Sequence, residues 1–382
     1  MSTTARRLAA AAAVLLAALA QGPPAAAAAA PAVTVLYTGL SNPRGLAFDP
    51  DGDLYVAEAG RGADGSPDPV CLPRPQGQGC FGATGAVGRL SVDGYERLLT
   101  GLPSLAGPDG TEAIGPTDVA FNRHGHSLLT IGLSEDPKVR AELPAPGQLM
   151  GGLYTMRRDP ESWQELRLYP QLVTDLGGHE AGTNPDGGEL DSNPQSVAYD
   201  ADGAVVSDAG ANSLLSVNPA GAVSTLAVFP NREAVAPPSF GLPPGTTVAM
   251  QSVPMGVAVR DGAYYVAELT GGPFPIGGAR VWRVVPDQPP TVYAQGLTTA
   301  IDLAFGPDGS LYVLEFTHTS MYGPERGVGA LMRIRREGAT PELVLGDINF
   351  PGGLTIRNGN AYLTDCSTCA TAGRVLRVPL PR

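Results

Sequence analysis

The sequence predicts an all-β protein, a six-bladed β-propeller with four antiparallel strands in each blade. Three observations support this. A segment of two short apolar strands joined by a tight turn occurs six times, further short strands follow each copy, and Gly and Pro contribute 50 and 37 of the 382 residues. Repeats of about 40 to 50 residues with short strands are typical of propeller blades. The frequent Gly and Pro residues favour turns over long helices.

The first copy, residues 42–58, reads NPRGLAFDPDGDLYVAE. It consists of an apolar strand, an Asp51-Gly52 turn and a second apolar strand that ends at Glu58. Asp-Gly and Asn-Gly pairs accommodate the positive φ that a tight hairpin needs. Five further copies open at Gly115, Asn193, Val253, Thr299 and Phe350. Where the spacing between copies exceeds the typical repeat, we expect insertions.

A third and a fourth strand are predicted after each copy. The third strands are 88–92, 152–156, 214–217, 279–284, 331–334 and 374–378, and five fourth strands end at Leu102, Leu172, Phe229, Leu297 and Ile348. The sixth copy has no fourth strand of its own. Residues 34–40, TVLYTGL, resemble the other fourth strands, so we expect the N-terminal strand to close the last blade beside 374–378.

The first thirty residues resemble a secretory signal peptide. Arg6 and Arg7 form a basic region, 8–20 is apolar, and an Ala-rich segment suggests cleavage near Ala29-Ala30. This segment is too short and too rich in Ala for a membrane anchor, and no later segment is long and apolar enough to span a bilayer. We therefore expect two parts, a signal peptide (1–30) and the propeller (31–382), in a secreted, extracellular or periplasmic protein.

Charge and cysteine content limit the partners and the redox state. The net charge of −12 argues against nucleic acid and anionic membranes, whose phosphates are met by Lys and Arg. Export favours disulfides, and local pairing of Cys71 with Cys80 and of Cys366 with Cys369 is the preferred connectivity. The alternative is a zinc site formed by all four thiolates. We expect a monomer that binds a small molecule or an extracellular component.

The long insertions are predicted to share one face of the propeller. They are 61–86, 103–115, 134–150, 174–192, 230–252, 270–278 and 317–329. Connections between strands two and three, and between strand four and the next blade, lie on the same side of an up-and-down blade. The opposite side carries short turns, such as those near His124 and Asn218. Insertions concentrated on one face of a repeat protein usually mark its binding face.

Carboxylates recur at the end of strand two, on the face with the insertions. They are Glu58, Asp208, Glu268, Glu315 and Asp365. Each is expected either to hold the loop that follows it, by accepting backbone hydrogen bonds, or to contribute to an acidic ring that attracts a cation or a sugar. Glu58, Glu268 and Glu315 are candidates for ligand binding.

The residues at the start of strand one lie nearest the propeller axis and differ between copies, as a single central site requires. Arg44, Asp118, Gln195 and Asp302 are the inner ligand-binding candidates. Asp118, Gln195 and Asp302 also form a candidate calcium site, because calcium binds six to eight oxygen ligands. Ordered water in a polar channel is the alternative.

One insertion, residues 178–193, is rich in oxygen-bearing side chains: GHEAGTNPDGGELDSN. It is either a calcium loop without the EF-hand spacing or a solvated, turn-rich loop. Of the four histidines, only His179 and His318 are predicted to lie on the face with the insertions.

Several segments together resemble the ScyD/ScyE family of secreted bacterial propellers. They are the signal peptide, NPRGLAFDPDGDLYVAEAG (42–60), GPTDVAF (115–121) and DSNPQSVAYDADG (191–203), and the resemblance extends over 33–378. The repeated GLAFDPDGDLYVAE is shared more widely, with NHL-type, gluconolactonase-like and quinone-dependent sugar dehydrogenase propellers. The resemblance implies export and the propeller fold. The family is named for proteins associated with cyanobacterial sunscreen-pigment synthesis, and it supplies no catalytic residues for this chain.

We therefore expect an exported binding protein whose ligand lies at the mouth of the channel. The alternatives are a lactonase-like hydrolase that uses a channel metal and a quinone-dependent sugar dehydrogenase. The dehydrogenase would need a histidine base, calcium and a cationic cluster for the quinone carboxylates. His318 and Arg326 are the nearest candidates for it, but the sequence shows no evident cationic cluster.

Overall fold

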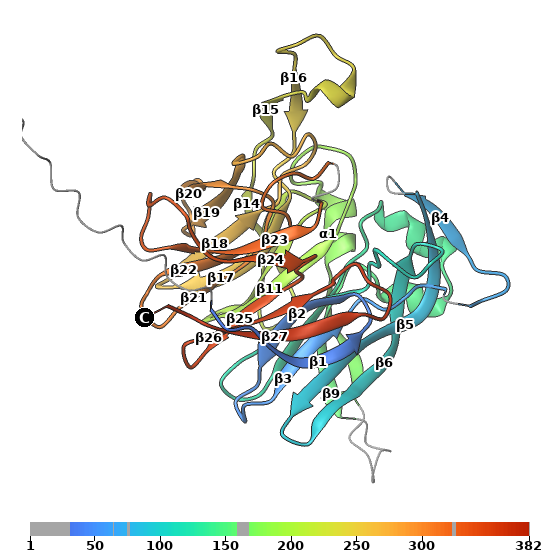
Figure 1. Cartoon of the computed structure of the whole chain (residues 1–382). Coiled ribbons are helices and arrows are strands. Elements are labelled where there is room, and N and C mark those ends of the chain that lie inside the picture. The colour runs from blue at the N-terminus through green and yellow to red at the C-terminus, as the bar shows by residue number, and fades with distance from the viewer. Residues whose placement is uncertain (1–30, 64, 75–76, 159–167, 323–325, 382) are drawn as a thin grey trace, which may run out of the picture. The chain divides into compact units, whose positions relative to one another are not determined.

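The computed structural model describes residues 31–63, 65–74, 77–158, 168–322 and 326–381 (Figure 1). The predicted signal peptide, residues 1–30, lies outside these ranges. The described chain is nearly all β, and most of its sheets have four antiparallel strands. Its one α-helix, α1 (Leu176–Thr183), has eight residues. No helix in the described ranges is long and apolar enough to cross a membrane.

The first three sheets follow the predicted order of strands. The first contains β2 (Pro43–Phe48), β3 (Leu54–Glu58), β5 (Gly77–Ser91) and β6 (Gly94–Ala106), and β4 (Cys71–Arg74) also pairs with β5. The second contains β7 (Pro116–Phe121), β8 (Ser127–Ile131), β9 (Gly152–Arg158) and β10 (Leu168–Asp175). The third contains β11 (Pro194–Asp200), β12 (Gly203–Asp208), β13 (Ser213–Val217) and β14 (Val223–Val228).

The remaining four-stranded sheets repeat this arrangement. The fourth contains β17 (Pro254–Arg260), β18 (Ala263–Glu268), β19 (Ala279–Val284) and β20 (Thr291–Leu297). The fifth contains β21 (Ala300–Phe305), β22 (Leu311–Glu315), β23 (Val328–Ile334) and β24 (Glu342–Asn349). The sixth contains β25 (Leu354–Arg357), β26 (Asn360–Asp365), β27 (Gly373–Pro379) and β1 (Thr34–Leu40).

The repeated hairpin forms for local reasons. Its apolar residues pack between sheets, and its turn tolerates an unusual backbone. Gly52 has φ +101°, and its N–H donates to Asp49 Oδ1 at 2.8 Å, which closes the turn between β2 and β3. Tyr55 of the first sheet packs against Phe121 of the second, with ring centroids 4.6 Å apart.

The first strands of the six sheets contact one another in sequence. β2 contacts β7, and the series continues through β11, β17, β21 and β25, which contacts β2 again. The N-terminal strand β1 pairs antiparallel with the C-terminal strand β27, from Thr34 opposite Arg377 to Leu40 opposite Gly373. Leu40 is fully buried, and the Tyr37 ring stacks on Tyr95 at a centroid distance of 4.3 Å.

Several predicted insertions contain regular structure. In 61–86, β4 and the first half of β5 form a hairpin in which Cys71 lies opposite Cys80. In 134–150 there are two 3-10 helices, η1 (Pro137–Glu142) and η2 (Ala145–Leu149), and 174–192 contains α1. In 230–252 a two-stranded ribbon, β15 (Arg232–Val235) and β16 (Thr247–Met250), encloses η3 (Pro238–Phe240) and extends away from the larger sheets (Figure 1).

The predicted disulfide pairing is confirmed. Cys71 is bonded to Cys80, and Cys366 is bonded to Cys369. The zinc alternative is wrong, because all four sulfurs are engaged in disulfides and no free cysteine is present in the described part of the chain.

Candidate functional site

Residues at the start of the first strands converge on one cavity, which we call the mouth cavity. Its volume is about 220 Å³. Four of them are second in their strands, Arg44, Gln195, Met255 and Ile301, and the equivalent residue of the sixth copy, Gly352, lies two residues before β25. Thr117, which is second in β7, lines an adjoining cavity of about 390 Å³ that shares Arg44, Gln195 and Met255 with the first. The local reason is the repeat itself, because the same strand position faces the same way in every copy.

The insertions supply much of the remaining lining: Arg74, Glu112, Ile114, Ser134, Met321 and Arg326. Leu269, Phe316, Pro351 and Thr368, which lie outside the predicted insertions, complete it. Insertion residues and residues at the start of the first strands therefore meet at one cavity. That this cavity is a binding site stays a prediction.

Arg44 is the basic residue that β2 places in this cavity. Its Nη2 donates to the carbonyl oxygen of Ala113 at 2.6 Å. Burial lowers the Arg44 pKa to about 10, an effect that nearby Glu112 opposes and nearby Arg74 reinforces. The guanidinium still carries its charge at neutral pH, and a buried cation favours an anionic partner.

Arg74 and Arg326 join Arg44 through Glu112. Arg326 Nη2 donates to Glu112 Oε1 at 2.7 Å. Arg74 donates to the backbone carbonyls of Leu105 at 3.3 Å and Glu112 at 3.5 Å, and its Nε is buried without a partner. Burial lowers the pKa of Arg74 as well. Three guanidiniums thus line the cavity beside Glu112, and Arg326 donates to its carboxylate. Glu135 is a second acidic neighbour of Arg74. We call Arg44, Arg74 and Arg326 the arginine cluster.

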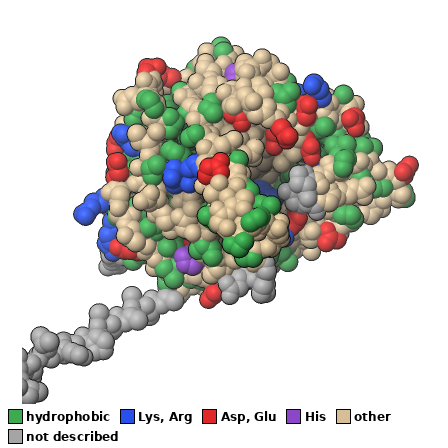
Figure 2. Space-filling model, turned by 90° about the horizontal axis from the view of Figure 1, so that it is seen from above, with side chains coloured by type: hydrophobic (Ala, Val, Ile, Leu, Met, Phe, Trp, Pro, Cys, Tyr) green, Lys and Arg blue, Asp and Glu red, His purple; other side chains and the backbone are tan. Residues whose placement is uncertain are grey.

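Part of the cavity lining is apolar. It includes Ile114, Met255, Leu269, Ile301 and Phe316. Elsewhere, acidic side chains are spread over the surface seen in Figure 2, in keeping with the net charge of −12. The mouth cavity thus combines three arginines and one glutamate, Glu112, with apolar side chains.

Asp118 and Asp302 lie one residue further along their strands and are tied to neighbouring sheets. Asp118 Oδ2 accepts from Ser196 Oγ at 2.7 Å and from the Val197 N–H at 3.0 Å. Asp302 Oδ2 accepts from the Leu354 N–H at 2.6 Å. Both have structural partners, and neither is among the described residues that line the mouth cavity or the adjoining cavity.

Glycines at the same strand position make room for both carboxylates. A Cβ at Gly45 would lie 2.0 Å from Asp118 Oδ1, and one at Gly256 would lie 2.4 Å from Asp302 Oδ1. Burial raises the pKa of Asp118 to about 6. Burial and the Asp118 charge raise the pKa of Asp302 well above its usual range. Within the described ranges, no three His, Cys, Asp or Glu side chains are arranged to hold a metal ion. The calcium site at Asp118, Gln195 and Asp302 stays a prediction.

The carboxylates at the ends of the second strands are buried inside the sheets. Glu58 accepts from the Ser41 N–H, the Tyr95 hydroxyl and Arg97, at 2.6 to 2.8 Å. Glu268 accepts from Ser252 Oγ and Arg232 Nη2, both at 2.8 Å.

Glu315 accepts from the Thr298 N–H at 2.7 Å and contacts His318 Nδ1. Glu58, Glu268 and Glu315 do not line the mouth cavity in the described structure. In each case one donor lies two positions before strand one: Ser41, Ser252 and Thr298. The sequence instead predicts donors in the loop that follows each carboxylate. These contacts fit a structural role.

The histidines also lie away from the mouth cavity. His318 borders a separate groove beside Gly338 and Leu343. His179 Nε2 lies 3.3 Å from Thr225 Oγ1 on β14. Among the described residues that line the mouth cavity and the adjoining cavity, none is a histidine.

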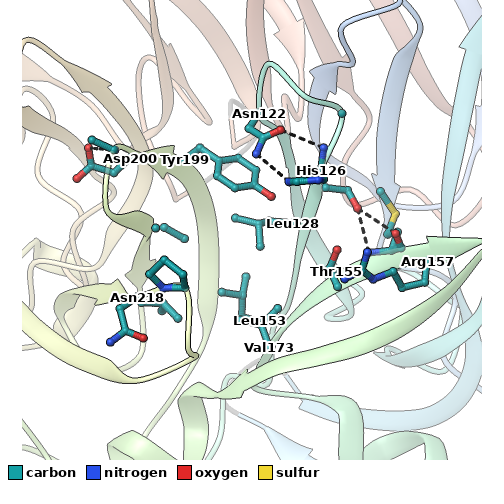
Figure 3. Close-up of a pocket in the computed structure, with 18 residues that line it drawn as sticks. Asn122, His126, Leu128, Leu153, Thr155, Arg157, Val173, Tyr199, Asp200 and Asn218 are labelled. Atoms are coloured by element: carbon teal, nitrogen blue, oxygen red, sulfur yellow. Dashed lines mark hydrogen bonds between the residues drawn. The ribbon is translucent and has the colours of Figure 1, made fainter.

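A larger cavity, of about 490 Å³, lies between the second and third sheets beside the short turns (Figure 3). Its floor is apolar, with Leu128, Leu153 and Val173. Several of its polar groups have local partners: Asn122 Oδ1 accepts from the N–H groups of His124 and His126. These hydrogen bonds are made within the turn that borders the cavity, so the Asn122 oxygen already has its partners. We therefore interpret this cavity as a groove between adjacent sheets.

Sequence reasoning identified Arg44 and Gln195 but missed Arg74 and Glu112. These two residues belong to different insertions, and no spacing in the sequence links them to each other or to Arg326. The one sequence signal that could have suggested Arg74 and Glu112 is that both lie in insertions that follow strands of the first sheet.

The chain is similar to several solved structures of propeller proteins. A quinone-bound aldose sugar dehydrogenase from Streptomyces coelicolor is 14% identical, with a TM-score of 0.50 over 91% of this chain and 98% of that chain. A luciferin-regenerating enzyme is 9% identical, with a TM-score of 0.50 over 91% and 95%. A virginiamycin B lyase from Staphylococcus aureus is 12% identical, with a TM-score of 0.46 over 92% and 99%.

No protein-family model matches the chain, and no curated protein matches its sequence. The structural neighbours are β-propeller proteins, and at these identities the likeness concerns the fold alone. The chain has a fold of the β-propeller kind.

Proposed function

We propose that this protein binds a small ligand in the mouth cavity and that the ligand combines an anionic group with an apolar body. The observation that carries the proposal is the arginine cluster: three guanidiniums line one cavity together with Glu112 and several apolar side chains. Of these, Arg326 donates to the Glu112 carboxylate, whereas Arg44 and Arg74 donate to backbone carbonyls. Guanidinium groups bind carboxylates, sulfonates and phosphates through charge-assisted, often paired hydrogen bonds. An apolar pocket with a few convergent polar groups is the usual form of a small-molecule site.

The proposal includes a closed six-bladed propeller that is exported as a monomer. The pairing of β1 with β27 and the continuous contacts of the first strands support closure. The disulfides support export, because such bonds persist in oxidising compartments. Membership of the ScyD/ScyE family belongs to the same proposal and rests on the sequence resemblance.

The anionic character of the ligand is tested with 8-anilinonaphthalene-1-sulfonate, a fluorescent probe that has an apolar body and one sulfonate. Arg326→Gln should weaken probe binding by about tenfold, the equivalent of about 1.4 kcal/mol, because one charge-assisted hydrogen bond is lost. Arg335→Gln is the matched control. Arg335 is also partly exposed and paired with a glutamate, at 2.8 Å, but it lies in the connection between β23 and β24 and does not line the mouth cavity.

Equal probe affinity in the wild type and Arg326→Gln would contradict the proposal, and so would equal losses in both variants. A thermal unfolding scan of each variant shows whether the fold is intact, since this probe also binds partly unfolded protein.

The enzymatic alternatives make different demands. The arginine cluster supplies cationic groups of the kind that a quinone-dependent dehydrogenase needs, but His318 borders a separate groove while Arg326 lines the mouth cavity. A lactonase-like hydrolase would require a metal in the channel. We expect no sugar-dependent reduction of an artificial electron acceptor after addition of pyrroloquinoline quinone and calcium. Turnover in that assay would replace the binding proposal with the dehydrogenase.

A further inference from the structure

A second cluster of charged side chains lies outside the mouth cavity, where α1 and the loop after it meet the loop that follows β8. Glu180 on α1 is its central residue. Its side chain is 1% exposed, and both of its carboxylate oxygens are buried without a hydrogen-bond partner. A buried carboxylate without a donor or a counter-charge is costly, so such a group requires a specific explanation.

The neighbours of Glu180 are also short of donors. Asp191 Oδ1 and Asn184 Oδ1 are buried and unpartnered, and so is Glu135 Oε1 on the far side of Asp191. All of the buried carboxylate and amide oxygens that lack a partner in the described chain belong to these four residues. The cluster is therefore a local excess of acceptors, unlike Asp208 beside it, which accepts from Ser192 Oγ and the Asn193 and Ala211 N–H groups.

The charges in the cluster have the same sign. The pKa of Glu180 is raised to about 7 by burial and by the charges of Asp208, Asp186 and Asp191. The pKa of Asp191 is raised to about 7 by burial and by Asp208, Glu135 and other carboxylates. Among the described residues, the charges that raise these two pKa values all belong to carboxylates. Glu135 differs, because the charge of Arg74 opposes the rise in its pKa.

We infer that Glu180, Asp191 and Asn184 form a binding site for calcium in the loop between α1 and β11. The ligand chemistry favours this ion. The donors are carboxylate and amide oxygens, which calcium prefers, whereas zinc prefers His and Cys. Only two of the three side chains are carboxylates, so backbone carbonyls and water would complete the six to eight oxygens that calcium requires.

Calcium in this position would hold the rim of the mouth cavity. The Ser134 N–H donates to the Ser192 carbonyl at 2.8 Å, and the Ser192 N–H donates to the Glu135 carbonyl at 3.3 Å. Ser134 lines the mouth cavity, and Asp191 lines the adjoining one. The cation would therefore connect α1 to the strand segment that borders both cavities.

The test uses the mature chain, stripped of metal with a chelator, with calcium chloride as the probe. Millimolar calcium at neutral pH should raise Tm by several degrees, and calorimetric titration should show one site per chain. Magnesium should have a smaller effect, because it demands a tighter octahedral arrangement. Glu180→Gln should lower calcium affinity by at least about tenfold. In metal-free buffer the same variant should be more stable than the wild type, since it removes an uncompensated buried charge.

Glu142→Gln is the matched control, because Glu142 is an exposed carboxylate on η1 whose charge is not among those acting on Glu180 or Asp191. It should leave the calcium response unchanged. If Glu180→Gln does not fold, calcium binding is measured in Asp191→Asn, and the metal content of the wild-type chain is measured after dialysis. A wild-type chain that retains no calcium overturns the inference. A wild-type Tm that does not respond to calcium also overturns it and would mean that Glu180 is buried as a neutral acid.

Discussion

The Asp118 carboxylate on β7 accepts a hydrogen bond from the Val197 N–H on β11 at 3.0 Å, across the boundary between two sheets. Asp302 makes the equivalent bond to Leu354 between the fifth and sixth sheets, at 2.6 Å. The two carboxylates thus hold together first strands that share no ladder of hydrogen bonds. Their raised pKa values make this arrangement sensitive to pH.

The first prediction concerns this sensitivity. Because the Asp118 pKa is raised to about 6, the folded protein binds more protons than the unfolded chain, whose Asp pKa is about 3.9. This contribution to stability is greatest at low pH and is lost as pH rises through about 6. In Asp118→Asn the free energy of unfolding should fall less steeply between about pH 4 and 7, because one titrating group is gone and the Asp302 pKa loses its charged neighbour.

The measurement is urea unfolding at several pH values. The quantity compared is the slope of the free energy of unfolding against pH, and not the absolute stability. Asp51→Asn, a change in an exposed turn residue, is the control and should keep the wild-type slope. A slope in Asp118→Asn equal to that of the wild type would show that the carboxylate pair does not control the pH dependence.

The second prediction separates structural carboxylates from ligand-binding ones. Glu268→Gln should lower the free energy of unfolding by about 2 kcal/mol, because Arg232 loses its charged partner inside the sheet and the new amide N–H₂ cannot accept from it. Binding of the anilinonaphthalene sulfonate probe should not change. Glu233→Gln, an exposed neighbour of Arg232, should affect neither quantity. If Glu268→Gln loses probe binding but keeps its stability, Glu268 is a ligand-binding residue and the prediction is wrong.

The third prediction concerns the N-terminal strand. A variant of the mature chain that begins at Ser41 lacks β1, so the edge of β27 is left unpaired and the stacking of Tyr37 on Tyr95 is lost. Its Tm should lie well below that of the chain that begins at Val33. Differential scanning calorimetry of both forms provides the comparison. Equal values would mean that β1 contributes nothing to closure.

The fourth prediction concerns the disulfides. Non-reducing peptide mapping should recover Cys71 linked to Cys80 and Cys366 linked to Cys369. Their sequence separations are 9 and 3 residues, so reduction should cost less than the roughly 3 kcal/mol expected for a 15-residue loop. Thermal unfolding with and without dithiothreitol measures the cost. If reduction lowers stability by more than the cost expected for a 15-residue loop, the disulfides contribute more than the closing of short loops.

Much of the fold could be predicted because its signals are local. Alternation of apolar residues identifies a strand, and Asp51-Gly52 identifies a turn, without reference to distant parts of the chain. The strand at residues 34–40 has the predicted bounds, and it was found because its sequence resembles the fourth strands of other copies. The local disulfides follow the same logic, because each joins cysteines that are close in sequence.

The site depended on tertiary structure, because its members are distant in the chain. Arg326 and Glu112 are 214 residues apart and meet in one ion pair. Glu58 and Glu268 recur at one strand position, as the sequence shows, but whether a carboxylate there faces a ligand or an internal donor depends on Arg97 and Arg232, which come from other segments. Periodicity determines which residues share a position in the blade. Only packing determines which charges have a partner, and Glu180 is buried without one.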